Sequence, residues 1–425
     1  MRKLFAFISV LFVLPLAAQD AGAVRQLQKL TQVYRYLNGL YVDEVDMQPL
    51  VESAITGMLE DLDPHSAYIG ADEMKGVQES FDGEFSGIGV EFNVLRDTVI
   101  VVNTIAGGPA ERVGVRANDR IVRIDTLDAV GMSRTDVPKH LRGKTGTKVG
   151  IDVVRHGTPG QLHFVIVRDK IPLNTVDASY LAGEGIGYIK VNRFGRTTMD
   201  EFTEAYRKLG RPEGLILDLR GNGGGILQEA VKILSMFVPK GTEVVSMHGR
   251  TKSSDATFVT QAEPLDTQIP IAVLVNSMTA SAAEIVSGAL QDLDRAVLVG
   301  QRTFGKGLVQ TPRPLGYNAF LKVTTAKYYI PSGRCIQAID YTHRNDDGSV
   351  GTVPDSLIRE FRTSGGRKVY DGGGVMPDVR IEPQYVSRFT TVLYGKGYLE
   401  DFANDYFRRH REGVDVDRFT LPDDE

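Results

Sequence analysis

The sequence predicts an α/β protein with a largely parallel sheet covered by helices. Apolar runs of strand length occur at residues 185–191, 214–220, 269–276 and 296–300. Segments with helical spacing of apolar residues separate them, at 202–209, 226–237 and after Ser281. Strands that alternate with helices in this way are typical of parallel sheets.

The most informative stretch is 269–310, which predicts a strand, a tight turn and a helix. Apolar residues recur at helical spacing from Ala282 to Leu290. Ser281 therefore falls at the first turn of this helix, where unpaired N–H groups and the helix dipole favour developing negative charge. This position suits a nucleophile, although a serine there can also be an ordinary N-cap.

A lysine and an amide follow this helix and the next strand. Lys306 lies between Gly305 and Gly307, and Gln310 comes four residues after Lys306, on the same face of a strand or a helix. Together with the run 276–284, these residues resemble the C-terminal processing peptidases. That family consists of tail-specific serine proteases with a Ser-Lys-Gln centre.

The resemblance implies a crotonase-like serine protease core with Ser281 as nucleophile, Lys306 as general base and Gln310 as its orienting partner. A glycine-rich turn at 221–225 follows the strand 214–220. Such a turn can be a close-packed loop, but it also exposes N–H groups at a helix N-terminus, as an oxyanion hole requires. The family pattern favours that use, and we expect the N–H groups of Gly224 and Ala282 to be the donors.

A lysine acts as a base only when it is deprotonated. Its ordinary pKa is near 10.4, so burial must lower the pKa to ~7–8. We expect Phe304, Leu308 and Val309 to form the apolar surroundings. Gln310 orients the amine without adding a charge that would raise its pKa. This chemistry needs no metal and no cofactor, and none is expected.

The segment 300–306 also resembles most of a phosphate-binding P-loop. That motif requires a Ser or Thr after the lysine to hold magnesium, and Gly307 stands there instead. The residues after Lys306 predict a strand, whereas a P-loop leads into a helix. Nucleotide binding is therefore disfavoured.

Residues 81–170 predict a separate strand-rich module similar to a PDZ domain. The pattern rests on the segments 85–92, 108–115 and 118–125. In that fold a glycine-rich loop offers N–H groups to the C-terminal carboxylate of a peptide, which adds to the sheet as a strand. The expected carboxylate-binding loop is Gly87, Ile88, Gly89 and Val90; a plain glycine-rich hairpin is the alternative.

The N-terminus has a basic head, a short apolar run and a small-residue end, as in a secretory signal peptide. We assign residues 1–19 to this signal, and we expect an exported product in the periplasm or at the cell envelope. Elsewhere no apolar run approaches the ~20 residues of a transmembrane helix, so the mature product should be soluble.

The remaining chain divides into an N-terminal helical region at 20–80, the protease core at 171–383 and a helical tail at 384–425. Two apolar stripes predict a helical hairpin at 24–62. The polar stretch 338–370 predicts an inserted loop, and Phe389 and Val392 are among the expected buried residues of the tail. His65 lies in a turn and is expected to be structural.

Composition is that of a globular protein, with a net charge of −5 and 42% hydrophobic residues. Mild acidity without basic clusters argues against a nucleic-acid partner. Cys335 is the only cysteine, so the chain forms no internal disulfide.

The sequence therefore predicts an exported serine endopeptidase that recognises and cleaves near the C-terminal tails of protein or peptide substrates. A homo-oligomer is compatible with this prediction. The alternative is a catalytically inert adaptor that binds peptides through its PDZ loop. The joint presence of Ser281, Lys306 and Gln310 favours the protease.

Overall fold

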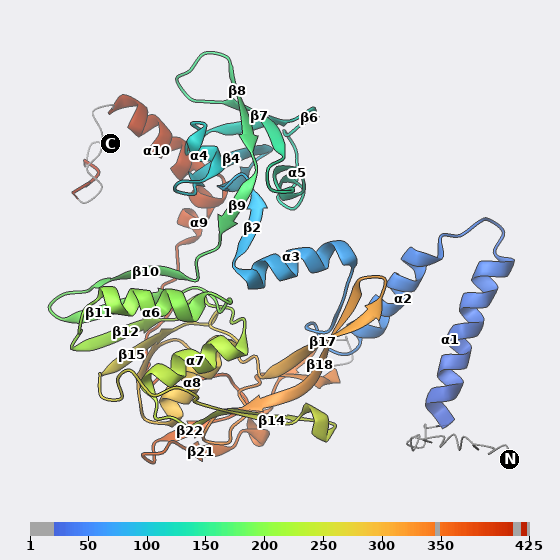
Figure 1. Ribbon diagram of the computed structural model, residues 1–425, viewed down its shortest axis with the longest axis vertical. Coiled ribbons are helices and arrows are strands. Elements are labelled where there is room, and N and C mark those ends of the chain that lie inside the picture. The colour runs from blue at the N-terminus through green and yellow to red at the C-terminus, as the bar shows by residue number, and fades with distance from the viewer. Residues whose placement is uncertain (1–20, 345–348, 411–417, 423–425) are drawn as a thin grey trace, which may run out of the picture. The chain divides into compact units, whose positions relative to one another are not determined.

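The computed structural model describes residues 21–344, 349–410 and 418–422 (Figure 1). The chain forms two units, one ending at Tyr68 and one beginning at Ile69. Residues 1–19, the predicted signal peptide, lie outside the described residues. No helix among the residues that the structure describes is long and apolar enough to cross a membrane.

The first unit contains the two predicted helices, α1 (Ala21–Leu40) and α2 (Met47–Glu60). Asp46 caps α2 by accepting the N–H of Gln48 at 3.0 Å, which satisfies one of the unpaired N–H groups of the first turn. After α2, Asp63 accepts the N–H groups of His65 and Ser66 at 2.8 and 2.9 Å. His65 thus lies in a turn that is closed by an aspartate side chain.

A six-stranded sheet forms the centre of the second unit, in the order β10-β11-β12-β15-β16-β23. The four strands from β11 to β16 pair in parallel, as the sequence predicts, β23 also pairs in parallel with β16, and β10 pairs antiparallel with β11. The strands are β10 (Val176–Leu181), β11 (Ile186–Val191), β12 (Gly214–Asp218), β15 (Ile271–Val275), β16 (Val297–Gly300) and β23 (Val379–Arg380).

Three helices pack with this sheet: α6 (Thr198–Lys208), α7 (Leu227–Phe237) and α8 (Ala282–Asp292). Every residue of α8 is buried, which is typical of a helix enclosed by the core. Apolar residues of α7, α8 and the parallel strands form one continuous core cluster. The helix that Ser281 precedes is therefore held firmly on all sides.

A second sheet contains a long hairpin of β17 (Leu308–Gly316) and β18 (Ala319–Tyr329), joined to β13 (Glu243–Gly249) and β14 (Ala256–Val259). Tyr317 and Asn318 turn the hairpin with φ values of 47° and 60°, as in a type I′ turn. The pairing of β17 with β18 shifts register between Val309 and Gln310. A strand, and not a helix, thus follows Lys306.

The module at 81–170 has a sheet and a core of its own. Two short helices, α4 (Pro109–Arg112) and α5 (Val137–Leu141), accompany the sheet. The chain enters after α3 (Ala71–Asp82) through β2 (Glu84–Gly87) and leaves through β9 (Asp169–Pro172), and these two strands pair antiparallel (Figure 1). The sheet strands are β3 (Val90–Leu95), β4 (Thr98–Thr104), β5 (Arg120–Ile124), β6 (Leu127–Asp128), β7 (Lys148–Val154) and β8 (Gln161–Val167).

The stretch 338–370 is not a plain loop, and that prediction was wrong. Its described residues form two short hairpins, β19 (Ile339–Arg344) with β20 (Val350–Thr352) and β21 (Glu360–Arg362) with β22 (Lys368–Tyr370). The second hairpin is anchored because Arg367 donates to Asp294 at 2.6 Å and to Asp378 at 2.6 Å.

The tail contains α9 (Arg388–Gly395) and α10 (Tyr398–Arg409), separated at Gly397, which has a φ of +72°. Phe389 and Val392 are exposed, so their predicted burial was wrong. Their helical spacing gives α9 an apolar face, which stays exposed among the residues that the structure describes. The remaining short elements are β1 (Ala67–Ile69) and the 3-10 turns Lys252–Ser254 and Asp355–Leu357.

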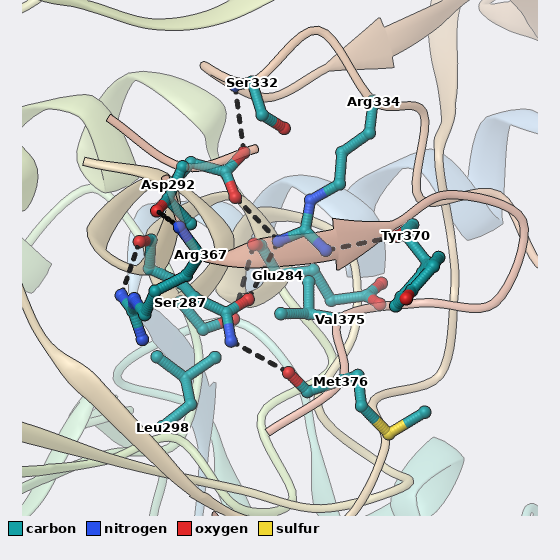
Figure 2. Close-up of polar contacts among 12 residues, drawn as sticks. Glu284, Ser287, Asp292, Leu298, Ser332, Arg334, Arg367, Tyr370, Val375 and Met376 are labelled. Atoms are coloured by element: carbon teal, nitrogen blue, oxygen red, sulfur yellow. Dashed lines mark hydrogen bonds and ion pairs between the residues drawn. The ribbon is translucent and has the colours of Figure 1, made fainter. Parts of the chain in front are cut away.

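A buried polar cluster holds the C-terminal end of α8 (Figure 2). Arg334 is fully buried and donates to Gln291 and Asp292, each at 2.8 Å, and to the Tyr370 carbonyl at 3.1 Å. Asp292 also accepts the N–H of Ser332 at 3.0 Å. A buried ion pair needs such additional hydrogen bonds to offset its desolvation. The cluster fastens α8 to the β21–β22 hairpin and to the turn after β18.

Candidate active site

The three residues predicted from the sequence as the catalytic centre line one cleft of the second unit. Ser281, Lys306 and Gln310 all contribute to a cleft of about 700 Å³. They come from different elements: the N-terminus of α8, the loop before β17, and β17 itself. The fold therefore brings a hydroxyl, an amine and an amide to one cleft.

Ser281 has a strained backbone, with φ 56° and ψ −119°. A non-glycine residue in this region costs on the order of 1–3 kcal/mol and persists only where the surroundings impose it. The turn from β15 into α8 is thus a sharp strand-to-helix turn that presents the serine side chain, as in nucleophile elbows. Here the motif Gly-x-Ser-x-Gly is absent, so the geometry is reached with other residues.

Gly224 permits this turn because it packs directly against Ser281. A Cβ at Gly224 would lie 2.7 Å from the Cβ of Ser281 and 2.9 Å from the amide nitrogen of Ala282. Such distances leave no room for any side chain. The glycine turn is therefore adjacent to Ser281, as the sequence predicts.

Of the two predicted oxyanion donors, Gly224 already has a hydrogen-bond partner. The N–H of Gly224 donates to the Asn222 side-chain oxygen at 2.8 Å. Asn222 is buried and is fixed in turn by the Val191 carbonyl, to which it donates at 2.9 Å. Ala282, the first residue of α8, lines the cleft, as do Gly223 and Gly225 on either side of Gly224.

Glu284 connects the serine and lysine segments from below the cleft. Its carboxylate is fully buried and accepts four hydrogen bonds. One oxygen accepts the N–H groups of Ser281 and Lys306 at 2.9 and 2.8 Å, and the other accepts from Thr303 and Gly305 at 2.5 and 2.7 Å. Burial raises the pKa of Glu284, and the four donors oppose this rise.

Gln310 is held on β17 by a hydrogen bond from its side-chain nitrogen to Thr324 at 3.2 Å. Leu308 and Val309 line the cleft beside Lys306, as predicted. Phe304 does not, and that prediction was wrong: the residue is 43% exposed. Ile285 of α8 contributes to the apolar lining instead.

Behind the glycine turn, Asp218 and Arg220 fix the end of β12. Asp218 is buried and accepts from Arg220 at 2.7 Å and from Tyr188 at 2.7 Å. Burial alone would raise the pKa of Asp218, but these hydrogen bonds outweigh it and hold the pKa below its ordinary value. Burial and the Asp218 charge raise the pKa of Tyr188 to about 12.

Comparison with known proteins identifies the family. A model of peptidase family S41 matches residues 185–355, a PDZ domain model matches 86–164, and a model of the activating protease CtpB N-terminal domain matches 15–73. The carboxy-terminal-processing protease of Bartonella bacilliformis is 37% identical over 356 residues, which are 80% of this chain and 81% of that protein. The chain belongs to the carboxy-terminal processing proteases.

Two further relatives have the same type of name. The carboxy-terminal processing protease CtpB of Bacillus subtilis is 35% identical over 328 residues, 76% of this chain and 68% of that protein. A solved structure of a photosystem II D1 C-terminal processing protease is 27% identical to this chain. The match covers 85% of this chain and 88% of the chain in that structure, with a TM-score of 0.46. The matches to peptidase family S41 and to the PDZ domain, with the relatives above 30% identity, show a serine-type peptidase with a PDZ domain.

In this processing protease the predicted carboxylate-binding loop joins β2 to β3. Gly87 ends β2, Val90 begins β3, and Gly89 has a φ of +74° that favours glycine. The carbonyl oxygens of Ile88 and Gly89 accept from Ala110 and Ile105, each at 2.9 Å. β3 is an edge strand of its sheet, so a peptide could pair with it.

Sequence reasoning gave no role to two residues of the protease site, Glu284 and Tyr328. Glu284 lies three residues after Ser281, which is the spacing of a capping box, so this signal was present. Tyr328 lines the cleft from β18, and only the pairing of β17 with β18 places it there. No local motif indicates that contact.

Proposed function

We propose that this processing protease is an exported endopeptidase that cleaves protein substrates near their C-termini, with Ser281 as nucleophile, Lys306 as general base and Gln310 as orienting residue. The observation that carries the proposal is that these three side chains line one cleft, with Ser281 strained at the N-terminus of a buried helix.

The proposed reaction begins when Ser281 Oγ attacks the substrate carbonyl carbon and its proton passes to neutral Lys306 Nζ. The tetrahedral intermediate collapses, the C–N bond breaks, and the lysine gives the proton to the leaving amine. Water then attacks the acyl-enzyme with the lysine again as base, which releases the acid product and restores Ser281.

The proposed oxyanion donors are the N–H groups of Ala282 and Gly224. Ala282 is at the N-terminus of α8, where the helix dipole stabilises negative charge. The Gly224 N–H would have to be shared between the oxyanion and Asn222, to which it donates at 2.8 Å. Oxyanion binding by Gly224 therefore requires a small displacement of the Asn222 side chain.

Substrate selection is proposed to occur at the PDZ module. The glycine-containing loop 87–90 would bind the terminal carboxylate, and the peptide would extend β3, an edge strand. The inert adaptor is disfavoured because the three catalytic side chains are retained together in the cleft. Export is proposed from the residues 1–19, and self-association remains compatible with this function.

One experiment tests the proposal directly. An unfolded protein substrate is digested with wild type and Ser281→Ala, using substrates that differ only in their last residues. We expect cleavage by wild type alone, at rates that depend on those residues. Cleavage by Ser281→Ala at the wild-type rate would refute the nucleophile, and tail-independent rates would refute the recognition mode.

A further inference from the structure

The segment 295–339 carries ionisable side chains of one sign. It holds seven Lys and Arg residues and no Asp or Glu, whereas the whole chain has 49 Lys and Arg against 54 Asp and Glu. The segment contains β16, the loop of Lys306 and the β17–β18 hairpin. Charges of one sign that lie close together produce a positive potential around them. An acidic ligand is therefore favoured where this segment lines a binding surface.

Part of this charge is used by the fold and by the proposed dyad. Arg334 forms a buried ion pair with Asp292 at 2.8 Å. Arg295 donates to the main-chain carbonyl of Ile269 at 2.6 Å, and Lys306 is the proposed base. The remaining cations of the segment are Arg302, Arg313, Lys322 and Lys327. Among these four, Lys322 is the one that lines the active-site cleft.

Lys322 lies on β18, in the part of the hairpin beyond Gln310 (Figure 1). It pairs with Pro312 of β17. Two residues along β18, Thr324 pairs with Gln310 and accepts a hydrogen bond from its side chain at 3.2 Å. Residues two apart on a strand point to the same face. Lys322 is therefore on the face of the hairpin that carries Gln310.

The cleft offers Lys322 no counter-charge. The residues that line the cleft include the cations Arg196, Lys306 and Lys322, and none of these lining residues is an Asp or a Glu. Within the part of the chain that the structure describes, the half-buried Lys322 amine forms no ion pair. Hydrogen bonds between an ammonium group and a carboxylate are stronger than neutral ones. A carboxylate that enters the cleft with the substrate would therefore be bound there.

The other side chains of the cleft set no preference of charge. Many of them are apolar, so they select substrate side chains by size and shape. They also exclude water, and an apolar surface strengthens the field of a charge beside it. The apolar lining residues include Leu227, Met247, Phe258, Ile285 and Val309.

We propose that Lys322 is a specificity-determining residue that binds a carboxylate of the substrate within the cleft, so that this protease prefers acidic segments beside the bond it cuts. This inference rests on the proposed function, because it concerns the substrate of that same cleft. The carboxylate is an Asp or Glu side chain, or the α-carboxylate of the substrate's terminus, since both present the same two oxygens. The site is additional to the predicted carboxylate-binding loop 87–90 of the PDZ module.

The position of Lys322 limits where the carboxylate lies in the substrate. Gln310 belongs to the proposed reacting centre, and the pair of Lys322 with Pro312 is ~7 Å farther along the hairpin, since a strand rises ~3.4 Å per residue. An extended substrate advances by the same amount per residue. The preferred acidic residue should therefore lie about two or three residues from the scissile bond.

The test uses peptides with blocked ends in which a single Glu is moved one position at a time on either side of the cleaved bond. Each peptide has a twin with Gln in its place, and kcat/KM is measured for wild type, Lys322→Gln and Lys327→Gln. Lys327 is the matched control, because it lies on the same strand but is exposed and does not line the cleft.

We expect wild type to cleave the best-placed Glu peptide about fivefold faster than its Gln twin, as for a partly exposed ion pair. The ratio should fall to about one in Lys322→Gln and stay at the wild-type value in Lys327→Gln. Lys322→Glu should prefer a Lys at that position instead. If Lys322→Gln slowed the Glu and Gln peptides equally, or left the ratio unchanged, the side-chain form of the proposal would be refuted.

A second peptide series distinguishes the α-carboxylate from a side chain. These peptides end at different distances from the cleaved bond, and each is made as the free acid and as the amide. An acid-to-amide ratio that falls in Lys322→Gln, without any Glu preference, would assign the site to the terminus. If neither ratio depended on Lys322, the proposal would be overturned.

Ionic strength gives a measurement that needs no variant. Salt screens a charge pair that is open to solvent, so raising the salt from ~0.05 to ~0.5 M should reduce the preference of wild type for Glu over Gln, or for acid over amide. A preference that stayed constant over this range would contradict a charge pair with Lys322.

A binding measurement separates this inference from the proposed function. Fluorescent Glu and Gln peptides, together with the acid and amide pairs, are titrated with Ser281→Ala and with Ser281→Ala/Lys322→Gln, and anisotropy reports the affinity. Binding of the carboxylate that depends on Lys322, without cleavage by wild type, would support the inference and refute the proposed function. Cleavage by wild type but not by Ser281→Ala, without any preference that depends on Lys322, would refute the inference alone.

Discussion

Glu284 accepts the main-chain N–H of Lys306 at 2.8 Å from beneath the cleft. The same oxygen accepts the N–H of Ser281 at 2.9 Å. One buried carboxylate therefore holds the main chains of Ser281 and Lys306, the proposed nucleophile and base, close together. Helix α8 begins with this residue in its first turn, so helix formation and assembly of the site are coupled.

Glu284→Gln should impair both stability and turnover. The amide nitrogen cannot accept, so two of the four donors lose their acceptor, and each buried unpaired group costs ~1–3 kcal/mol. We expect a loss of unfolding free energy of about 2–6 kcal/mol, measured by urea denaturation, and a fall in kcat. Glu229→Gln is the control, because Glu229 is a buried carboxylate of α7 that accepts from Met199 at 3.0 Å. It should lower stability without lowering kcat per folded molecule.

The pH dependence of stability should also depend on Glu284. Burial raises its pKa in the folded state, so the folded protein binds the proton more tightly than the unfolded chain. The stabilisation is complete below the unfolded pKa and is lost as pH rises through the folded pKa. The unfolding free energy of wild type relative to Glu284→Gln should therefore decrease from acid to neutral pH. An increase over that interval would contradict the assignment.

Ser281→Ala and Lys306→Ala should each abolish turnover. Because the two residues act as a unit, the double variant should be no slower than either single variant. Gln310→Ala should be milder, since Gln310 only orients the amine. Steady-state kinetics with a peptide substrate measure these effects, and circular dichroism checks the fold. An active, folded Lys306→Ala would exclude the lysine as base.

Turnover should rise with pH as Lys306 loses its proton, and chelators should leave it unchanged. The measurement is kcat/KM between pH 6 and 10, with and without EDTA. If EDTA inhibited the protein and added zinc restored its activity, the protein would be a metalloenzyme, and the Ser-Lys mechanism would be refuted. Tyr328 should not contribute a second titration in this range, since burial raises its pKa well above the ordinary value.

Gly224→Ala should nearly abolish activity. The new Cβ would lie 2.7 Å from the Cβ of Ser281, and a displacement of the nucleophile by about 1 Å costs on the order of a hundredfold in rate. Gly221→Ala is the matched control: Gly221 has a similar positive φ of +77°, yet a Cβ there meets nothing within 4 Å. The Gly221→Ala variant should have a lower free energy of unfolding but should keep most of its kcat. Equal losses of kcat in both variants would assign the effect to backbone strain.

The last prediction concerns the PDZ loop at 87–90. Amidating a substrate's C-terminus removes charge-assisted hydrogen bonds worth ~1.5–3 kcal/mol each, so peptide affinity should fall at least tenfold. Gly89→Val should have the same effect. Gly107→Val is its control, because Gly107 has a φ of +70° in the same module with open space around it. Calorimetry measures binding. If amidated and free peptides were cleaved at equal rates at substrate concentrations below saturation, the module would not recognise the C-terminal end of the substrate.

Much of this architecture could be predicted from local patterns. The continuous apolar runs at β12 and β15 indicated parallel strands, and Ser281, Lys306 and Gln310 followed from their motif. Local sequence patterns failed where contacts between segments that are distant in sequence determine the structure. Phe304 was predicted to form part of the apolar surroundings of Lys306, but it is exposed. The segment 338–370 looked like a loop because its order comes from contacts such as Arg367 with Asp294, far apart in sequence. The crotonase-like character of the core stays a prediction.

The polar cluster around Arg334 has a consequence for regulation. Helix α8 is fastened at its C-terminal end by Arg334 and at its N-terminal end by Glu284, and all its residues are buried. Axial sliding or rotation of this helix would break the Arg334–Asp292 ion pair at one end and the hydrogen bonds of Glu284 at the other. A switch between resting and working forms must therefore leave α8 stationary. Gln310 is held instead by Thr324 of β18, so we expect any conformational switch to move Gln310 and to leave Ser281 in place.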